Sequence, residues 1–285
     1  MTPRIDFLSF AGRGVALTKH LAVFAALMAL WEFAARFGLV DTILLPPPRQ
    51  IAQGLIQLYI ENREIYWHFW VTFLEALGGF LIGGGLGLIL AVGSAQSPSF
   101  RRYVAPYAIA LNVTPGLALT PIIIAWFGFG MSSKVALGAI VCFFPVFVNT
   151  LIGLTRTDED TLEMFRSLGA SRWQTFLKLQ VPEALPITFA GCKIAITTAL
   201  VGAVVAEFSQ GTAGIGILMQ RFAFALDMSS AIAALLSMSL LGLILFYLIE
   251  ILDDLIVFWR RDRRMEAVGR RRQARWEAGL SKSRD

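Results

Sequence analysis

Charged residues are scarce in this sequence. They make up 16% of its 285 residues, whereas hydrophobic residues make up 56%. Soluble domains carry about 25% charged residues because their surfaces face water. So low a share of charge excludes an ordinary soluble domain and predicts an integral membrane protein.

Residues that hold metals or act as nucleophiles are also few. The sequence contains two cysteines and two histidines. Cys142 and Cys192 lack CxxC spacing and are expected to be small packing residues, and His20 and His68 stand far apart. With no Gly-x-Ser-x-Gly motif and no paired carboxylates in a polar setting, we predict neither a metal site nor a catalytic site.

No Gly-Lys pair occurs anywhere in the sequence. The loop that cradles nucleotide phosphates requires Gly-Lys followed by Ser or Thr. The chain is therefore not expected to bind ATP through that loop. We predict that this chain binds no cofactor of its own.

Long apolar runs are what the sequence has in abundance. A helix that crosses the hydrocarbon core of a bilayer needs about 20 mostly apolar residues. The first run has the character of a signal peptide, but no small-residue cleavage site after Leu21 leads into a soluble domain, so we expect a retained helix. The six predicted spans are 19–39, 70–95, 104–127, 134–154, 187–207 and 229–258.

Basic residues are distributed unequally among the connections between these spans. Lys and Arg beside a span resist translocation and stay in the cytoplasm. If both termini are cytoplasmic, 19 of the 25 Lys and Arg residues lie on the cytoplasmic side and four on the outer side. We therefore predict a cytoplasmic N-terminus (1–18), a transmembrane domain (19–258) and a basic cytoplasmic tail (259–285).

The tail carries the Arg-rich stretch GRRRQAR at 269–275. Such a cluster next to a span is attracted to anionic lipid headgroups. Nucleic-acid binding by the tail is the less favoured alternative, so we expect membrane lipid and no nucleic acid as its partner.

The outer connection after the first span begins with LLPPPRQI, whose prolines end the helix. Ile51, Leu55, Leu58 and Tyr59 then recur at helical spacing. This pattern predicts an interfacial helix lying on the outer leaflet. A plain connector is the alternative.

Glycine and proline mark two of the spans. Gly79, Gly83 and Gly87 stand four apart on one face of the second span, where small residues let helix backbones approach closely. Pro115 and Pro121 each remove a helical hydrogen bond from the third span. Breaks of this kind occur where transporter helices line a pathway, and also in purely structural membrane helices.

The cytoplasmic segment 156–186 is charged and amphipathic. A capping box at Asp160–Glu163 predicts the start of a short helix, and Gly169 can adopt the left-handed conformation that ends it. A second capping box at Ser171–Gln174 opens another helix. The segment is therefore predicted to form two short helices joined by an elbow.

Two prolines and two aromatic residues complete this segment. Pro182 and Pro186 are expected to close the second helix and restart the chain into the fifth span. Trp173 and Phe176 would be poorly placed in water. They either enter a groove on a partner or pack back against the ends of the chain's own spans.

This segment resembles the EAA loop of bacterial ABC-importer permeases. The pattern of that loop is Glu-Ala-Ala, then Gly, then an aliphatic residue ten positions later, followed by Leu-Pro. The residues that match it are Glu163, Gly169, Leu179 and Pro182. The residues that depart from it are Met164, Phe165 and Val181.

The resemblance extends over most of the membrane portion, from about residue 40 to residue 258. LLPPPRQI, TPIIIAWFGFGMSSK (120–134) and VVAEFSQGTAGIGILM (204–219) follow one another in the same order as in one subfamily. Its members are permeases for taurine, aliphatic sulfonates, nitrate and thiamin-precursor pyrimidines. The chain is thus identified as a member of the binding-protein-dependent ABC permeases.

The resemblance implies an all-α integral membrane protein with about six transmembrane helices in the type I ABC importer permease fold. The coupling EAA loop lies between helices 4 and 5. In similar permeases two copies each dock this loop onto a cytoplasmic ABC ATPase subunit, which holds ATP and Mg²⁺. A periplasmic solute-binding protein delivers the solute, and ATP binding switches the helices from inward-open to outward-open. The chain is expected to be a non-enzymatic subunit of the bacterial inner membrane, paired with an identical copy.

The same resemblance assigns roles within the loop. Gly169 supplies the elbow, the stretch Ser171–Leu179 transmits force, and charged residues on either side orient the contact. The residues expected to couple the chain to the ATPase are Glu163, Arg166, Gly169, Ser171, Arg172, Trp173, Phe176, Leu179 and Pro182.

In similar permeases the third and fifth helices line the solute path. The candidates for solute contact on these helices are Asn112, Thr114, Thr197 and Thr198. The alternative is that their hydroxyl groups bond to their own backbone. Glu75 should face protein or water because a carboxylate in hydrocarbon is costly. Glu207 is expected at the outer mouth, where it gates the path or meets the binding protein, or is an ordinary helix-end carboxylate.

Positive charge within the spans is limited to Arg36 and Lys193. Arg36 can pair with Glu32 four residues earlier, and Lys193 can snorkel to the cytoplasmic surface. We therefore favour a neutral, zwitterionic or heteroaromatic solute over a simple anion, although backbone amides at helix ends also bind anions. The second choice of function is a secondary transporter of a small solute, which would need an inverted repeat that the sequence does not display.

Overall fold

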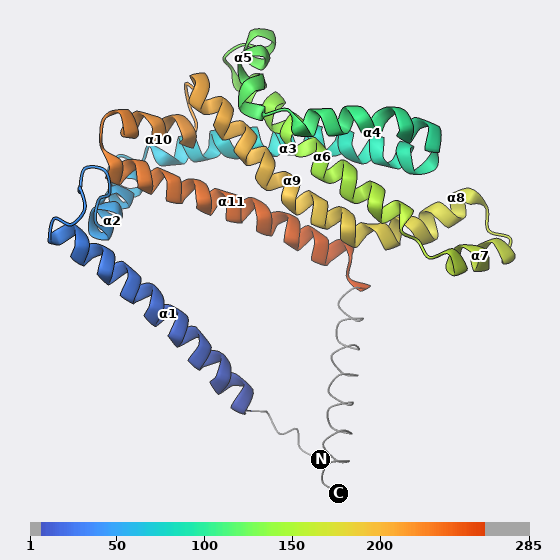
Figure 1. Cartoon of the computed structure of the whole chain (residues 1–285), viewed down its shortest axis with the longest axis horizontal. Coiled ribbons are helices and arrows are strands. Elements are labelled where there is room, and N and C mark those ends of the chain that lie inside the picture. The colour runs from blue at the N-terminus through green and yellow to red at the C-terminus, as the bar shows by residue number, and fades with distance from the viewer. Residues whose placement is uncertain (1–6, 260–285) are drawn as a thin grey trace, which may run out of the picture.

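The protein is an assembly of helices. The computed structural model describes residues 7–259, and every regular element within that range is helical (Figure 1). Four long helices lie side by side as a bundle, with α6 packed extensively against both α3 and α9. These helices are α3 (Ile65–Gln96), α6 (Met131–Thr155), α9 (Val181–Gln210) and α11 (Met228–Ile256).

The other elements lie around this bundle. Helix α1 leaves the bundle at an angle, and its main contact is with α2 (Figure 1). The remaining helices are α1 (Phe7–Arg36), α2 (Pro48–Ile56), α4 (Pro98–Val113), α5 (Gly116–Phe127), α7 (Glu159–Ser167), α8 (Arg172–Thr175) and α10 (Ile215–Phe224). Two π-helical turns, η1 (Gln57–Glu61) and η2 (Phe176–Gln180), follow α2 and α8.

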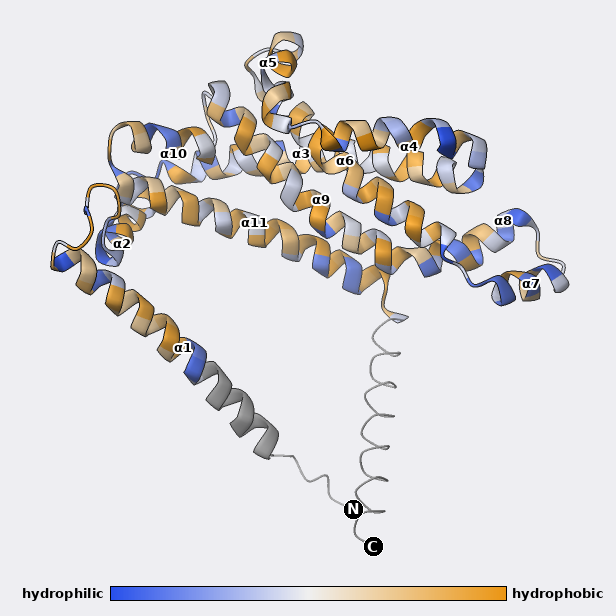
Figure 2. Cartoon of the chain, viewed as in Figure 1, coloured by the Kyte–Doolittle hydropathy of each residue, from blue (hydrophilic) through white to orange (hydrophobic). Residues whose placement is uncertain are grey.

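The length and composition of the helices agree with the predicted number of spans. Five helices are long and apolar enough to cross a membrane, and the bent pair α4 and α5 brings the number to six. Hydrophobic residues run along these helices, whereas α7 and the start of α8 are largely hydrophilic (Figure 2). The all-helical membrane architecture predicted from the sequence is confirmed.

The glycine stripe of α3 faces α6, as the four-residue spacing predicts. A Cβ atom placed on Gly83 would overlap the backbone of Ala139, and one placed on Gly87 would lie 2.7 Å from the carbonyl oxygen of Phe143. From α9, a Cβ atom on Gly202 would lie 2.9 Å from the Cα atom of Gly138 of α6. Helix α6 is therefore held between two neighbours at backbone contact, which strengthens packing in lipid.

The third predicted span is not one continuous helix. Helices α4 and α5 meet at an angle of 101°, and the break lies at Thr114 and Pro115, both of which are extended. A residue before proline avoids the helical conformation because the proline ring clashes with its backbone. The break that Pro115 predicts is therefore confirmed and divides the expected span 104–127 into two helices, whereas Pro121 is accommodated inside α5.

The outer connection forms the predicted helix, but the helix packs on protein. Ile51 and Leu58 are buried, and α2 lies against α11. The Tyr59 hydroxyl donates a hydrogen bond to Ser237 Oγ at 3.0 Å. The apolar face predicted to enter the outer leaflet thus rests largely on α11, and the alternative of a plain connector is wrong.

Substitution of Gly83 tests the backbone contact between α3 and α6. Gly83→Leu is expected to destabilise the protein by about 1–3 kcal/mol, because the added side chain must displace the backbone of α6. Gly85→Leu is the matched control, since nothing lies within 4 Å of a Cβ atom at Gly85. Thermal unfolding of both variants in detergent measures the difference, and equal midpoints would contradict the proposed packing.

Candidate functional site

The elbow predicted for the segment 156–186 begins with α7, whose start differs from the prediction. The side chain of Asp158 caps the helix by accepting a hydrogen bond from the Thr161 backbone N–H at 3.2 Å. The predicted capping box at Asp160–Glu163 is therefore wrong. Asp160 lies inside the first turn, where a carboxylate still interacts favourably with the helix dipole.

The turn of the elbow is built as the sequence predicts. Gly169 has a φ of +76°, and its backbone N–H donates to the Arg166 carbonyl oxygen at 2.9 Å. Ser171 and Gln174 then form the expected capping box: the Ser171 N–H donates to Gln174 Oε1 at 2.8 Å, and the Gln174 N–H donates to Ser171 Oγ at 3.2 Å. The left-handed glycine and the capping box together define the angle between α7 and α8.

The second helix of the elbow does not stop at Pro182. Helices α8, η2 and α9 form one continuous helix from Arg172 to Ser209, 38 residues long. The π turn η2 precedes Pro182, so this proline lies in the first turn of α9, where a missing N–H is tolerated. The expectation that the prolines separate the elbow from the fifth span is therefore wrong.

The two aromatic residues of the elbow have different environments. Phe176 is only 6% exposed and packs against Leu154 and Ala184, so for this residue the alternative of packing against the chain itself is correct. Trp173 is 65% exposed, although its ring stacks on that of Phe176 with centroids 5.6 Å apart. We define the elbow patch as the exposed apolar residues Met164, Leu168, Trp173 and Leu177.

The charged residues of the elbow surround this patch. Glu163, Arg166 and Arg172 are exposed, and within residues 7–259 none of the three forms an ion pair. Their charges are consequently accessible to an external partner. Arg166 lies in the last turn of α7 and Arg172 at the start of α8, so one precedes and the other follows the turn at Gly169.

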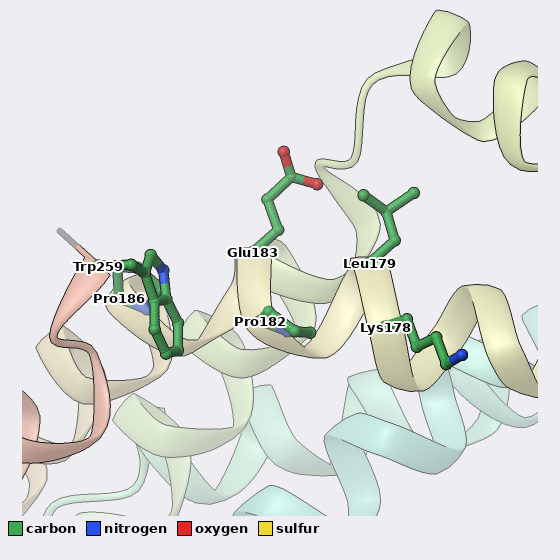
Figure 3. A pocket seen from close by; sticks show the side chains of 6 residues that line it. All are labelled: Lys178, Leu179, Pro182, Glu183, Pro186 and Trp259. Carbon is green, nitrogen blue, oxygen red and sulfur yellow. The ribbon is translucent and has the colours of Figure 1, made fainter. Parts of the chain in front are cut away.

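A pocket of about 360 Å³ opens where η2 continues into α9. Two residues predicted to couple the chain to an ATPase, Leu179 and Pro182, line it (Figure 3). The ring of Trp259, just beyond α11, lies beside Pro186 and closes one end (Figure 3). The pocket thus lies between the start of α9 and the segment just beyond α11.

The candidate residues for solute contact are dispersed. Asn112 and Thr114 are exposed at the end of α4, whereas Thr197 and Thr198 belong to α9, and α4 packs against α3 and α6. The Thr114 hydroxyl donates to the Ala110 carbonyl oxygen at 2.9 Å. The hydroxyls of the other two threonines also donate to carbonyl oxygens of their own helix, as the alternative foresaw.

Glu207 is the centre of a buried hydrogen-bond network at the outer end of the bundle. Its Oε1 accepts from Thr72 Oγ1 at 2.7 Å, and its Oε2 accepts from the Gly216 N–H at 2.5 Å. Thr72 Oγ1 also accepts from the Ile215 N–H at 2.8 Å, and His68 Nδ1 accepts from the Gly214 N–H at 3.0 Å. The network ties α9 to α3 and to the first turn of α10.

The burial of Glu207 is at odds with one of the roles expected for it, contact with a binding protein. The side chain is fully buried and is therefore not accessible to a binding protein in this structure. Gly214, at φ +122°, brings the turn so close that a Cβ atom there would overlap the Glu207 carboxyl group. Glu207 thus stabilises the turn at the start of α10 through a buried hydrogen bond.

Glu75 extends the same network. It is buried in protein, as expected of a carboxylate in a span, and its carboxyl group contacts that of Glu207. The ammonium group of Lys134, which donates to the carbonyl oxygens of Phe129 and Gly130 at 3.0 and 3.2 Å, acts electrostatically on both carboxyl groups.

Sequence reasoning missed three members of this network. They are His68, Thr72 and Lys134. The available signal was the spacing of His68, Thr72 and Glu75, which places three polar residues on one face of an otherwise apolar helix.

The two cations of the spans are both paired. Arg36 Nε lies 3.0 Å from Glu32 Oε1, which confirms the predicted pair. Lys193 Nζ lies 2.7 Å from Asp253 Oδ2 and also contacts the Glu250 carboxylate. The expectation that Lys193 snorkels to the cytoplasmic surface is therefore wrong.

Comparison with known proteins gives consistent matches. A family model described as "Binding-protein-dependent transport system inner membrane component" matches residues 83–257. The formylaminopyrimidine transport permease protein ThiX of Halalkalibacterium halodurans is 33% identical over 84% of this chain and 94% of its own length. The putative aliphatic sulfonates transport permease protein SsuC of Bacillus subtilis is 30% identical over 85% and 87%.

Two further matches extend the comparison. The riboflavin transport system permease protein RibX of Chloroflexus aurantiacus is 31% identical over 82% of this chain and 87% of its own length. A chain of the MetNI methionine ABC transporter in an inward-facing conformation superposes with a TM-score of 0.54 at 20% identity. The superposition covers 70% of this chain and 96% of the other, and it shows a shared fold.

Removal of the Thr72 hydroxyl tests the outer network. Thr72→Val keeps the shape of the side chain but leaves the Ile215 N–H and Glu207 without their shared partner, so the protein is expected to lose about 1–3 kcal/mol of stability. Thr155→Val is the control, because the Thr155 hydroxyl is exposed and bonds to its own helix.

Two measurements follow this change. Thermal unfolding in detergent should show a lower midpoint for Thr72→Val than for Thr155→Val. Hydrogen exchange should become faster at the start of α10, because the Ile215 N–H loses its acceptor. Unchanged exchange in that turn would show that the network does not hold it.

Proposed function

The chain belongs to the family of binding-protein-dependent transport system inner membrane components, and from this membership we propose that its elbow takes up work from a separate ATPase. The chain is a permease subunit of an ABC importer. Membership of this family decides against the secondary transporter that the sequence left as second choice. The observation that carries the proposal is the exposure of Trp173 at the start of a helix that continues into the membrane.

The elbow patch supports a docking role. Large apolar side chains exposed in an otherwise hydrophilic segment are typical of interaction sites, and tryptophan with arginine is the commonest composition of energetic hot spots. Here Trp173 is exposed next to the unpaired charges of Arg166 and Arg172. A groove on the ATPase that accepts Trp173 and carries acidic groups at its rim would complement this surface.

The continuous helix supports transmission of the resulting force. A helix of 38 residues is about 57 Å long, which exceeds the hydrocarbon core of about 30 Å. Its cytoplasmic end carries Trp173, and its outer end carries Glu207, which binds the turn before α10. A displacement of the elbow would therefore be passed along this helix, through the π turn η2 and Pro182, to the outer turn.

The partners and the location follow from this proposal. Cytoplasmic ABC ATPase subunits bind ATP and Mg²⁺, a periplasmic solute-binding protein delivers the solute, and a second copy of the chain completes the pathway. The bacterial inner membrane surrounds the pair, with both termini in the cytoplasm. The coupling residues proposed from the sequence retain their roles, with Phe176 acting as the base on which Trp173 rests.

For the solute we propose a small heteroaromatic or zwitterionic molecule. Two of the relatives above are named for heteroaromatic solutes, formylaminopyrimidine and riboflavin. The cations of the described spans are occupied: Arg36 and Lys193 by carboxylates, and Lys134 by backbone carbonyl oxygens. An anion would have to displace these partners. Uptake assays with a radiolabelled pyrimidine precursor and with taurine distinguish the classes, and selective taurine uptake would overturn this preference.

Substitution of Trp173 tests docking directly. Trp173→Asp is expected to weaken binding of the ATPase by about 2 kcal/mol or more, roughly thirtyfold, because the anchor of the contact is lost. Co-purification of the ATPase in detergent and ATP-dependent uptake measure the effect. Ser99→Asp, an exposed change in the other cytoplasmic turn, is the control. Full co-purification and uptake with Trp173→Asp would refute the docking role.

Gly169 tests the geometry of the elbow independently of its surface. Gly169→Pro should abolish uptake while membrane insertion persists, since proline cannot adopt the φ of +76° found there. Gly169→Asn is expected to retain most uptake because asparagine tolerates the left-handed conformation. Equal uptake by the two variants would show that uptake does not depend on the angle of the elbow.

A further inference from the structure

Lys193 forms an ion cluster with two carboxylates of a different helix. Its Nζ lies 2.7 Å from Asp253 Oδ2 and contacts the carboxylate of Glu250. Lys193 belongs to α9, and both carboxylates belong to α11, one turn apart. Asp253 is buried and Glu250 is partly exposed. The cluster therefore joins two spans by charge inside the bundle.

Such a cluster is costly unless its geometry is maintained. Charged side chains within a span are rare and pair with one another, and removing one partner leaves an uncompensated charge in a low-dielectric interior. If α11 slid past α9 by one turn, Asp253 would lose its contact with Lys193. The energy of the cluster consequently depends steeply on the register of the two helices.

The cluster lies where the other contacts between α9 and α11 do not fix the register of the two helices. Toward the outer side, α9 and α11 share an apolar core that includes Leu200 and Leu245. Toward the cytoplasm lies the pocket, which is lined by residues of α9 such as Pro182 and by Trp259, just beyond α11 (Figure 3). Apolar contact is non-directional and permits sliding, and the contact at the pocket, where the ring of Trp259 lies beside Pro186, is also apolar. The ion cluster is thus the directional link between them nearest to the elbow.

We propose that Lys193 is a positioning residue that locks α11 to the continuous helix of the elbow, so that both move as one body when the ATPase pulls. This inference rests on the proposed function of the elbow. Helix α11 in turn packs against α2 and α10, so the ion cluster would extend the movement to these outer elements. Without it, α9 moves alone and ATP hydrolysis is no longer converted fully into transport.

The experiment uses the complete transporter, with its ATPase and binding protein, in proteoliposomes. Lys193→Met removes the charge and keeps the length of the side chain, and Lys193→Arg keeps the charge. The ratio of solute transported to ATP hydrolysed is expected to fall roughly tenfold for Lys193→Met and to remain close to the unsubstituted ratio for Lys193→Arg. Co-purified ATPase should match the unsubstituted complex in both, which a folding defect would not allow.

An exchange of charges provides the second readout. In Lys193→Asp combined with Asp253→Lys the pair is restored with opposite polarity, so the transport ratio should recover well above that of either single variant. An unchanged ratio in Lys193→Met overturns the proposal. Failure of every variant to assemble, including Lys193→Arg and the exchanged pair, also overturns it, because the cluster would then serve stability alone.

A chemical cross-link between positions 193 and 253 tests the coupling even if the exchanged pair packs poorly. With Cys142→Ala and Cys192→Ala removing the native thiols, Lys193→Cys and Asp253→Cys can be joined by a flexible bifunctional thiol reagent. The cross-linked double-cysteine protein should show a higher transport ratio than the same protein before cross-linking. An unchanged ratio would count against coupling. If the unsubstituted complex shows no ATP-driven uptake, the proposed function itself fails. If uptake is normal and Lys193→Met leaves the transport ratio unchanged, only the role inferred for Lys193 fails.

Discussion

Backbone contact between α6 and its two neighbours is the constraint on which the rest of the structure depends. Apolar side chains gain nothing by leaving lipid for another helix, so close packing must supply the association energy. Gly83 of α3 and Gly202 of α9 bring their backbones against adjacent residues of α6, Ala139 and Gly138. Once α9 is fixed in this way, its cytoplasmic continuation presents the elbow at a defined place and angle.

Polar contacts at both ends of α9 complement this apolar middle. Glu207 binds α3 and the turn before α10 at the outer end, and Lys193 binds α11 nearer the cytoplasm. Glu207 and the partner of Lys193, Asp253, are buried, where an unsatisfied polar or charged group is expensive. They therefore define which arrangement of helices is allowed, whereas the apolar core supplies most of the contact area. A helix with a directional contact at each end is well suited to carry movement from the elbow to the outer surface.

The elbow combines two properties that rarely occur together. Its helices are hydrophilic enough to lie in water (Figure 2), yet Trp173 and Leu168 are left exposed although Phe176 nearby is buried. Phe176 anchors the second helix to the bundle, and Trp173 rests on it and faces outward. The same short helix thus serves as a rigid part of the membrane bundle and as a surface for an external partner.

The sequence by itself determined the features that depend on neighbours a few residues apart. The number of spans follows from apolar length, the end of α7 from Gly169, the start of α8 from the Ser171–Gln174 box, and the α3 contact face from glycines at four-residue spacing. Only the tertiary structure decided the rest. The π turn lets Pro182 continue the helix, and the partners of Glu207 and Lys193 come from residues 135 and 60 positions away. No local pattern encodes such contacts, because they exist only after the helices have packed.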